Sequence, residues 1–196
     1  MFENSEISEE FKLKDGRVVL IKRLLIEDYE KNNNYEFVHD WLNKVNKYLL
    51  GEFEKEDLQQ NREYFYNKLS NKAEDLMIGA IYNQRIIASA GISVNLKLKK
   101  IKHIGNWGIS IHPDFQNQGL ATRIMKILEY IATDGGLKKL EADFFEGNDI
   151  AEHLYVRKLG YEIEGRRKYA ALLKDGTYVD KFIMGKIIDK SIKKNK

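Results

Sequence analysis

The chain has 196 residues, of which 43% are hydrophobic and 11% aromatic, so it is long enough to bury a core and is expected to form one domain. It contains no cysteine, which excludes a disulfide framework, a cysteine-ligated metal centre and a cysteine nucleophile. The formal net charge is +3, and residues 189–196 alone, with four lysines and one aspartate, account for 4 − 1 = +3. The rest of the chain is neutral overall, so a nucleic-acid partner is not expected.

The N-terminal residues are acidic and lack the apolar core of a signal peptide, and no run of about 18 apolar residues predicts a membrane span. These features predict a cytoplasmic protein with no membrane partner. We expect a single domain over residues 1–188 and a basic, disordered tail over residues 189–196. Attraction of this tail to an anionic partner is an alternative that the sequence leaves open.

Hydrophobic patterning predicts alternating strands and helices in the first half of the chain. Asp15 and Gly16 mark a turn before the first strand, and three polar residues separate two apolar runs that predict a β-hairpin. The predicted strands are 18–21, 76–82, 86–94 and 102–111, and the predicted helices are 27–45 and 56–69.

The second half continues the alternation. An amphipathic helix is predicted over residues 120–131, with Gly135 and Gly136 as its stop, and Asp175 and Gly176 form a strong hairpin turn. The other predicted elements are strands over 139–145, from 161 onward and over 178–187, and a helix over 149–159. This order predicts an α/β (α+β) fold with a mixed sheet.

One turn lies between the strand ending at Ile111 and the helix beginning at Leu120, and it contains the chain's single proline, Pro113. It lacks the glycine patterns of nucleotide-triphosphate and dinucleotide sites, but it reads Q-x-x-G-x-A from Gln116 to Ala121. Gly119 and Ala121 keep the helix start free of bulk, so an anion can approach its unpaired N–H groups. A plain helix start, in which the glycine eases the bend, is the alternative reading of this pattern alone.

A second stretch, residues 148–161, reads N-D-I-A-E-H-L-Y-V-R-K-L-G-Y. Asn148 stands where a helix N-cap is favoured and Gly160 where a C-terminal glycine is favoured. Tyr155 shares one helical face with apolar residues, so a core aromatic residue with a polar tip is one reading of it.

Together and in this order, the two stretches resemble the GNAT superfamily of N-acetyltransferases, in particular the branch that acts on ribosomal-protein N-termini and polyamines. The resemblance covers about residues 12–188. It implies a GNAT-type fold with a central mixed, mostly antiparallel sheet of about seven strands flanked by about four helices. It also implies acetyl-CoA as cosubstrate, no metal, and an amine acceptor: a small amine, a polyamine or a protein N-terminus.

The resemblance also implies the site residues. Backbone at 109–111 would pair with the pantetheine amides, residues 118–123 would bind the pyrophosphate, and the Tyr155 hydroxyl would protonate the departing thiolate as the catalytic acid. Arg123 adds a positive charge that a bound anion would balance. The expected acetyl-CoA-binding residues are Ile109, Ser110, Ile111, Gln116, Asn117, Gln118, Gly119, Leu120, Ala121, Thr122, Arg123, Asn148, Tyr155 and Lys158.

The base that removes the amine proton is not evident, because Asn106 stands where many relatives carry a glutamate, and an amide cannot accept the proton. The carboxylate candidates are Glu141, Asp143, Glu146 and Asp180. The acidic residues 51–57 are a candidate contact for a cationic acceptor, with a solvated helix start as the alternative. His103, His112 and His153 are not spaced as metal ligands.

Two further readings stay open. A protein of the same fold could bind CoA without catalysis, as a sensor or scaffold, and the loss of the usual glutamate at Asn106 motivates this alternative. A homodimer is compatible with the resemblance.

Overall fold

The structure is a computed structural model that describes residues 1–2, 7–49, 51, 53–189 and 191–192. Its α-helices are α1 (Ile26–Glu30), α2 (Asn34–Lys44), α3 (Leu58–Ser70), α4 (Leu120–Asp134) and α5 (Asp149–Glu152). Its strands are β1 (Ser8–Lys12), β2 (Val18–Arg23), β3 (Asp75–Tyr82), β4 (Arg85–Ser93), β5 (Ile104–Ile111), β6 (Lys139–Phe145), β7 (Glu162–Leu172) and β8 (Tyr178–Ile187).

The strands form one mixed sheet in the order β1-β2-β3-β4-β5-β6-β8-β7, with β5 and β6 parallel. This confirms the predicted fold class, but the sheet has eight strands, not about seven. The missed strand is β1, whose sequence SEEFK contains three charged residues and only one large apolar side chain. Because β1 is an edge strand without a buried face, it carries no hydrophobic alternation from which it could be predicted.

Contacts between residues divide the chain into two compact units. The first consists of residues 1–93 and 108–128, and the second of residues 94–107 and 129–196. Both β5 and α4 contribute residues to each unit. The units are described separately below.

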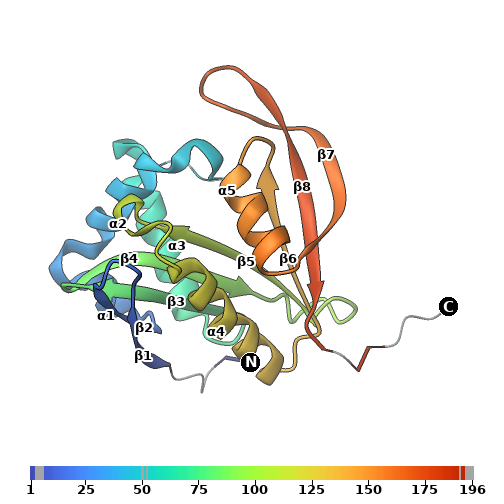
Figure 1. Cartoon of the computed structure of the whole chain (residues 1–196), viewed down its shortest axis with the longest axis horizontal. Coiled ribbons are helices and arrows are strands. Elements are labelled where there is room, and N and C mark those ends of the chain that lie inside the picture. The colour runs from blue at the N-terminus through green and yellow to red at the C-terminus, as the bar shows by residue number, and fades with distance from the viewer. Residues whose placement is uncertain (3–6, 50, 52, 190, 193–196) are drawn as a thin grey trace. The chain divides into compact units, whose positions relative to one another are not determined.

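In the first unit, β1 to β4 are joined as successive antiparallel neighbours, with α2 packed on β4 and α3 on β3. These elements are the blue to green part of the ribbon in Figure 1. A buried cluster from the helices and the sheet includes Tyr29, Val38, Trp41, Phe65 and Ile86. The Trp41 indole N–H donates to the Ile86 carbonyl at 3.1 Å, so this large core side chain has its polar group paired.

The helix predicted over residues 27–45 is divided into α1 and α2. Asn32 and Asn33 between them adopt left-handed backbone angles, with φ of 54° and 52°, which asparagine tolerates better than most residues. The Asn34 side chain then donates to the Asp28 and Gln84 carbonyls at 2.8 and 3.1 Å. The break is therefore held by side-chain hydrogen bonds, which hydrophobic periodicity does not report.

The predicted hairpin is confirmed as β3 and β4, joined by a two-residue turn. Asn83 and Gln84 both have positive φ, 47° and 63°, as a turn matching the right-handed strand twist requires.

In the second unit, the first residues of β5 pair in parallel with β6, and β8 pairs antiparallel with both β6 and β7. Figure 1 shows β7 and β8 as a long orange and red ribbon pair. The strands predicted over 139–145 and 178–187 are confirmed with the same bounds. The helix predicted over 149–159 begins as α5 and continues as a π-helical turn, His153–Lys158, a feature often found at functional sites.

The predicted tail lies partly outside the described residues, since Lys190 and residues 193–196 are not among them. The Asp189 carboxylate pairs with Lys138, and the pKa of Asp189 is lowered to about 2, chiefly by this hydrogen bond. A disordered tail remains a prediction.

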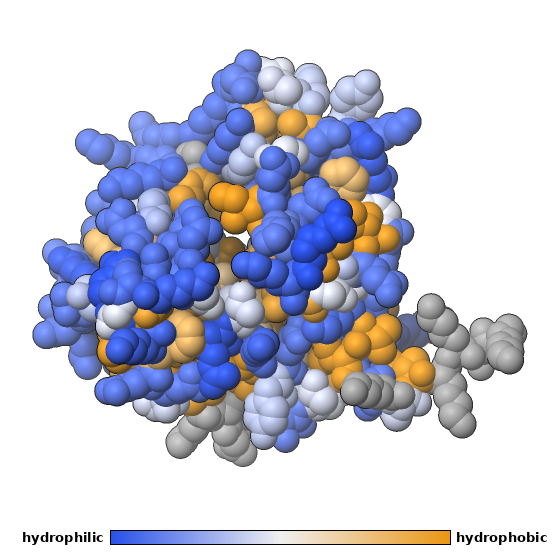
Figure 2. Space-filling model, in the orientation of Figure 1, coloured by the Kyte–Doolittle hydropathy of each residue, from blue (hydrophilic) through white to orange (hydrophobic). Residues whose placement is uncertain are grey.

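The face of the molecule in Figure 2 is largely hydrophilic, with smaller hydrophobic areas between the polar side chains. Within the described ranges, no helix combines the length and the apolar character that crossing a bilayer requires.

Candidate functional site

The predicted anion-binding turn is the β5–α4 loop, residues 112–119, in the first unit. It opens with a short 3₁₀ turn, Pro113–Phe115, capped by His112, whose Nδ1 accepts a hydrogen bond from the Asp114 N–H at 3.2 Å. The Gln116 side-chain amide donates to the Ile111 carbonyl at 3.2 Å, tying the loop back to the end of β5. The loop therefore has a fixed course before α4 begins.

Gly119 ends this loop with a φ of +85°, a conformation that favours glycine. A Cβ atom built on Gly119 would meet only one atom within 4 Å, Cζ of Phe11 at 3.9 Å. The next residue starts α4, and the first N–H groups of a helix have no intrahelical acceptor. An open approach to a helix N-terminus suits a phosphate group.

Two further predicted binding side chains, besides Gln116, are already engaged within the first unit. The Arg123 guanidinium forms a bidentate ion pair with Glu9, with Nε to Oε1 at 2.7 Å. Oε1 of Gln118 accepts a hydrogen bond from the backbone N–H of Asp15 at 3.1 Å. Sequence reasoning placed a ligand anion beside Arg123, whereas the structure places the carboxylate of Glu9 there.

The remaining predicted binding residues of this unit lie at the end of β5, in the β5–α4 loop and at the start of α4. The three residues 109–111 end β5 and are partly exposed. Asn117, with a φ of 61°, adopts a left-handed backbone conformation like Gly119. Ala121 and Thr122 lie in the first turn of α4. Leu120 is fully buried, so only its backbone can face a ligand.

In the second unit, Asn148 caps α5 as predicted, because its side-chain oxygen accepts a hydrogen bond from the Ala151 N–H at 3.1 Å. Tyr155 lies on the π-helical turn that follows. Lys158 ends that turn with an exposed side chain.

The Tyr155 ring packs edge-on against Trp107, with ring centroids 4.8 Å apart and planes at 89°, and also contacts Phe144 at 6.3 Å. Burial, reinforced by the charge of Asp143, raises the pKa of Tyr155 to about 12. The phenol is therefore protonated at neutral pH, as a proton or hydrogen-bond donor must be. No signal in the sequence indicates that Trp107 contacts Tyr155.

Asn106 is exposed on β5 and lies opposite Glu141 of β6 in the strand register. Each of the four candidate bases has a basic partner. Glu141 pairs with Lys139 at 2.8 Å and Asp143 with Lys181 at 2.9 Å, while Glu146 and Asp180 both pair with Arg166.

Asp180 is the one buried carboxylate among them. It accepts a hydrogen bond from the Tyr169 N–H at 2.8 Å, and this bond and Arg166 hold the pKa of Asp180 below its usual range. Its contacts suit a structural role in joining β7 to β8 better than proton abstraction.

The acidic stretch at 51–57 precedes α3, and its Glu52 lies outside the described residues. The backbone N–H of Glu54 donates to the Asp57 carboxylate at 2.9 Å, so Asp57 caps the short turn before the helix. A contact with a cationic acceptor remains a prediction.

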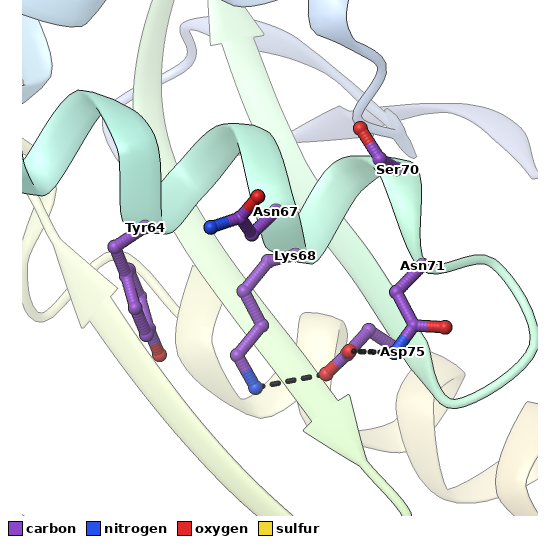
Figure 3. A pocket seen from close by; sticks show the side chains of 6 residues that line it. All are labelled: Tyr64, Asn67, Lys68, Ser70, Asn71 and Asp75. Carbon is purple, nitrogen blue, oxygen red and sulfur yellow. Dashed lines mark hydrogen bonds and ion pairs between the residues drawn. The ribbon is translucent and has the colours of Figure 1, made fainter.

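Two open hollows lie along α3, neither containing a predicted site residue. One, of about 510 Å³, is shown in Figure 3, where Lys68 and Asn71 both point to Asp75. The second, of about 540 Å³, is lined by Glu30, Tyr35, Gln59, Arg62, Glu63, Tyr66 and Asn67. The charges in the first hollow are paired with one another, and we assign it no role.

The sequence matches the profile described as the acetyltransferase (GNAT) family over residues 36–161, more than half of the chain. The spermidine N(1)-acetyltransferase of Escherichia coli (strain K12) is 35% identical over 77 residues, which are 39% of this chain and 41% of that relative. The chain thus spans less than half the length of the curated relative that it matches.

Solved structures agree over most of the chain. The GNAT-family acetyltransferase from Streptococcus pneumoniae has a TM-score of 0.68 at 26% identity, covering 87% of this chain and 99% of that chain. The ribosomal-protein-S5-alanine acetyltransferase from Vibrio fischeri has a TM-score of 0.71 at 16% identity, covering 94% of this chain and 98% of that chain. At this lower identity the likeness shows the fold alone.

Proposed function

Because this chain belongs to the GNAT family of acetyltransferases, we propose that it transfers the acetyl group of acetyl-CoA to a primary amine. The observation that carries the proposal is the open helix start at Gly119, where a positive φ and free space suit the approach of a phosphate. Residues 118–123 would bind the pyrophosphate chiefly through backbone N–H groups, since Gln118 and Arg123 have partners within the protein.

Acetyl-CoA supplies an acetyl group activated as a thioester. In the proposed reaction a C–N bond forms as the C–S bond breaks, the amine gives up one proton and the sulfur gains one. The protein has to hold the two reactants in line, which can account for much of the acceleration. No protein nucleophile is required.

Tyr155 is the proposed donor to the departing sulfur. Its raised pKa keeps the phenol protonated throughout the usual assay range. It also makes complete proton transfer to a thiolate less favourable, because a thiol such as that of cysteine, with a pKa of about 8.5, is a stronger acid than this phenol. Hydrogen-bond donation in the transition state is therefore the role that its environment supports best.

The proton of the amine has no carboxylate acceptor at Asn106, and the four carboxylate candidates are ion-paired. We propose that water or a backbone carbonyl receives this proton. An amine that is already neutral would need the least help from such a weak base.

For the acceptor, we propose a primary amine of either of two kinds, a polyamine or the N-terminus of a protein. The partial match to a spermidine acetyltransferase supports the first, and the fold likeness to an acetyltransferase of a ribosomal-protein alanine supports the second. A cytoplasmic location would suit both kinds.

Ligand binding followed by turnover tests the proposal. We expect saturating acetyl-CoA to raise the unfolding temperature by several degrees, because it binds the native state alone. Thiol release is then measured with spermidine and with peptides starting in alanine or serine. We expect turnover with at least one acceptor, lowered about hundredfold in Tyr155→Phe.

Absence of a thermal shift at saturating acetyl-CoA would contradict the proposal. Binding without turnover on any of these amines would instead favour the CoA-binding sensor or scaffold. Tyr178→Phe, which changes an exposed tyrosine of the same unit, is the matched control and should leave turnover unchanged.

A further inference from the structure

The hairpin of β1 and β2, residues 8–23, contacts the β5–α4 loop at both of its ends and also contacts the first turn of α4. Both parts belong to the first unit, although about a hundred residues separate them in sequence. The hydrogen bonds come from three positions on the hairpin: Glu9 in β1, and Asp15 and Arg17 in its turn.

Arg17 contacts the loop at two neighbouring residues. Its Nη2 donates to the carbonyl of Asp114 at 2.7 Å, and its guanidinium lies over the Phe115 ring, 3.9 Å from the centroid. The guanidinium is itself oriented by Asp15, whose Oδ2 accepts from Nε at 2.8 Å. One side chain thus contacts both the backbone of Asp114 and the buried ring of Phe115, two residues of the 3₁₀ turn that opens the loop.

The other contacts fix the far end of the same segment. The backbone N–H of Asp15 donates to Gln118, one residue before Gly119, at 3.1 Å. Glu9 holds Arg123 one turn into α4 by two parallel hydrogen bonds, the strongest geometry for this pair. Phe11 is the side chain nearest to a Cβ at Gly119, at 3.9 Å, and leaves that position open.

We propose that the β1–β2 hairpin is a clamp that orders the β5–α4 loop for acetyl-CoA, with Arg17 as its principal positioning residue. This inference rests on the proposed function. A loop with 3₁₀ and left-handed residues loses much conformational entropy when it becomes ordered. Because the clamp orders the loop in the unliganded protein, this entropy is not lost again when acetyl-CoA binds. The clamp also occupies the Gln118 and Arg123 side chains, which leaves the pyrophosphate to the backbone N–H groups.

The test compares Arg17→Gln with Lys14→Gln, which removes the same charge from an exposed residue of the same turn. CoA and pantetheine, which lacks the nucleotide and its pyrophosphate, are titrated calorimetrically. We expect Arg17→Gln to weaken CoA binding about tenfold and to leave pantetheine binding unchanged. Arg17→Lys keeps a positively charged donor for the Asp114 carbonyl, which glutamine does not, and should recover part of the loss.

Amide hydrogen exchange of the unliganded protein provides a second readout that needs no ligand. Residues 116–122 should exchange faster in Arg17→Gln and at the wild-type rate in Lys14→Gln. Unchanged exchange, or an equal loss of affinity for CoA and pantetheine, would overturn the clamp. A wild-type protein that binds neither compound would instead contradict the proposed function, while the exchange result still decides whether the hairpin orders the loop.

Discussion

His112 shows how a single side chain links the loop to the core of the first unit. Its ring stacks on that of Phe37, with 5.7 Å between the ring centroids. The ring centroids of Trp41 and Phe115 lie 6.0 and 5.7 Å from that of His112. Burial lowers the pKa of His112, and Lys44 and Arg17 lower it further, although Asp114 acts in the opposite direction. The neutral ring is the form whose Nδ1 can accept the Asp114 N–H.

This environment predicts that acid destabilises the protein through His112. Since its folded pKa lies below the unfolded value of about 6.5, the unfolded state takes up a proton first as the pH falls. The free energy of unfolding, measured by urea denaturation, should therefore decrease from pH 7.5 to pH 5.5. In His112→Gln this decrease should be smaller, whereas exposed His153→Gln should retain it. Equal slopes for wild type and His112→Gln would contradict the assignment.

At the scale of elements, α4 has a glycine of the same conformation at each end. Gly119 and Gly136 both have a φ of +85°, and a Cβ on either would meet little or nothing within 4 Å. Backbone strain is therefore the same at the two positions. Only Gly119 lies at the helix start proposed to receive the pyrophosphate.

Alanine at either glycine should lower the free energy of unfolding by roughly 1–2 kcal/mol, the cost of a left-handed conformation for a residue with a Cβ. Gly119→Ala should in addition raise the Kd for acetyl-CoA, because a methyl group then stands beside the first N–H groups of α4. Gly136→Ala should leave that Kd unchanged, as calorimetry can show. If both variants bound acetyl-CoA alike, the helix start would not be the phosphate site.

At the scale of the whole molecule, the formal charge is carried by the C-terminal residues. Deleting residues 190–196 removes four lysines and changes the net charge from +3 to −1. We expect kcat and KM for the amine to stay unchanged, because the proposed site residues precede position 159. Retention on an immobilised polyanion should fall, since the remaining chain has a net charge of −1. A loss of amine acetylation on deletion would assign these residues a part in the reaction.

The alternation of strands and helices, the glycine turn before α4 and the N-cap at Asn148 could be predicted from the sequence, because periodicity, turn glycines and caps are local properties. The sequence could not determine β1, whose charged edge strand buries no face, or the break at Asn32 and Asn33, which depends on distant hydrogen bonds. The tertiary structure alone decided which side chains meet: Glu9 with Arg123, Arg17 with the β5–α4 loop, and Trp107 with Tyr155. Such pairs depend on strand order and register, which bring together residues as much as 114 positions apart.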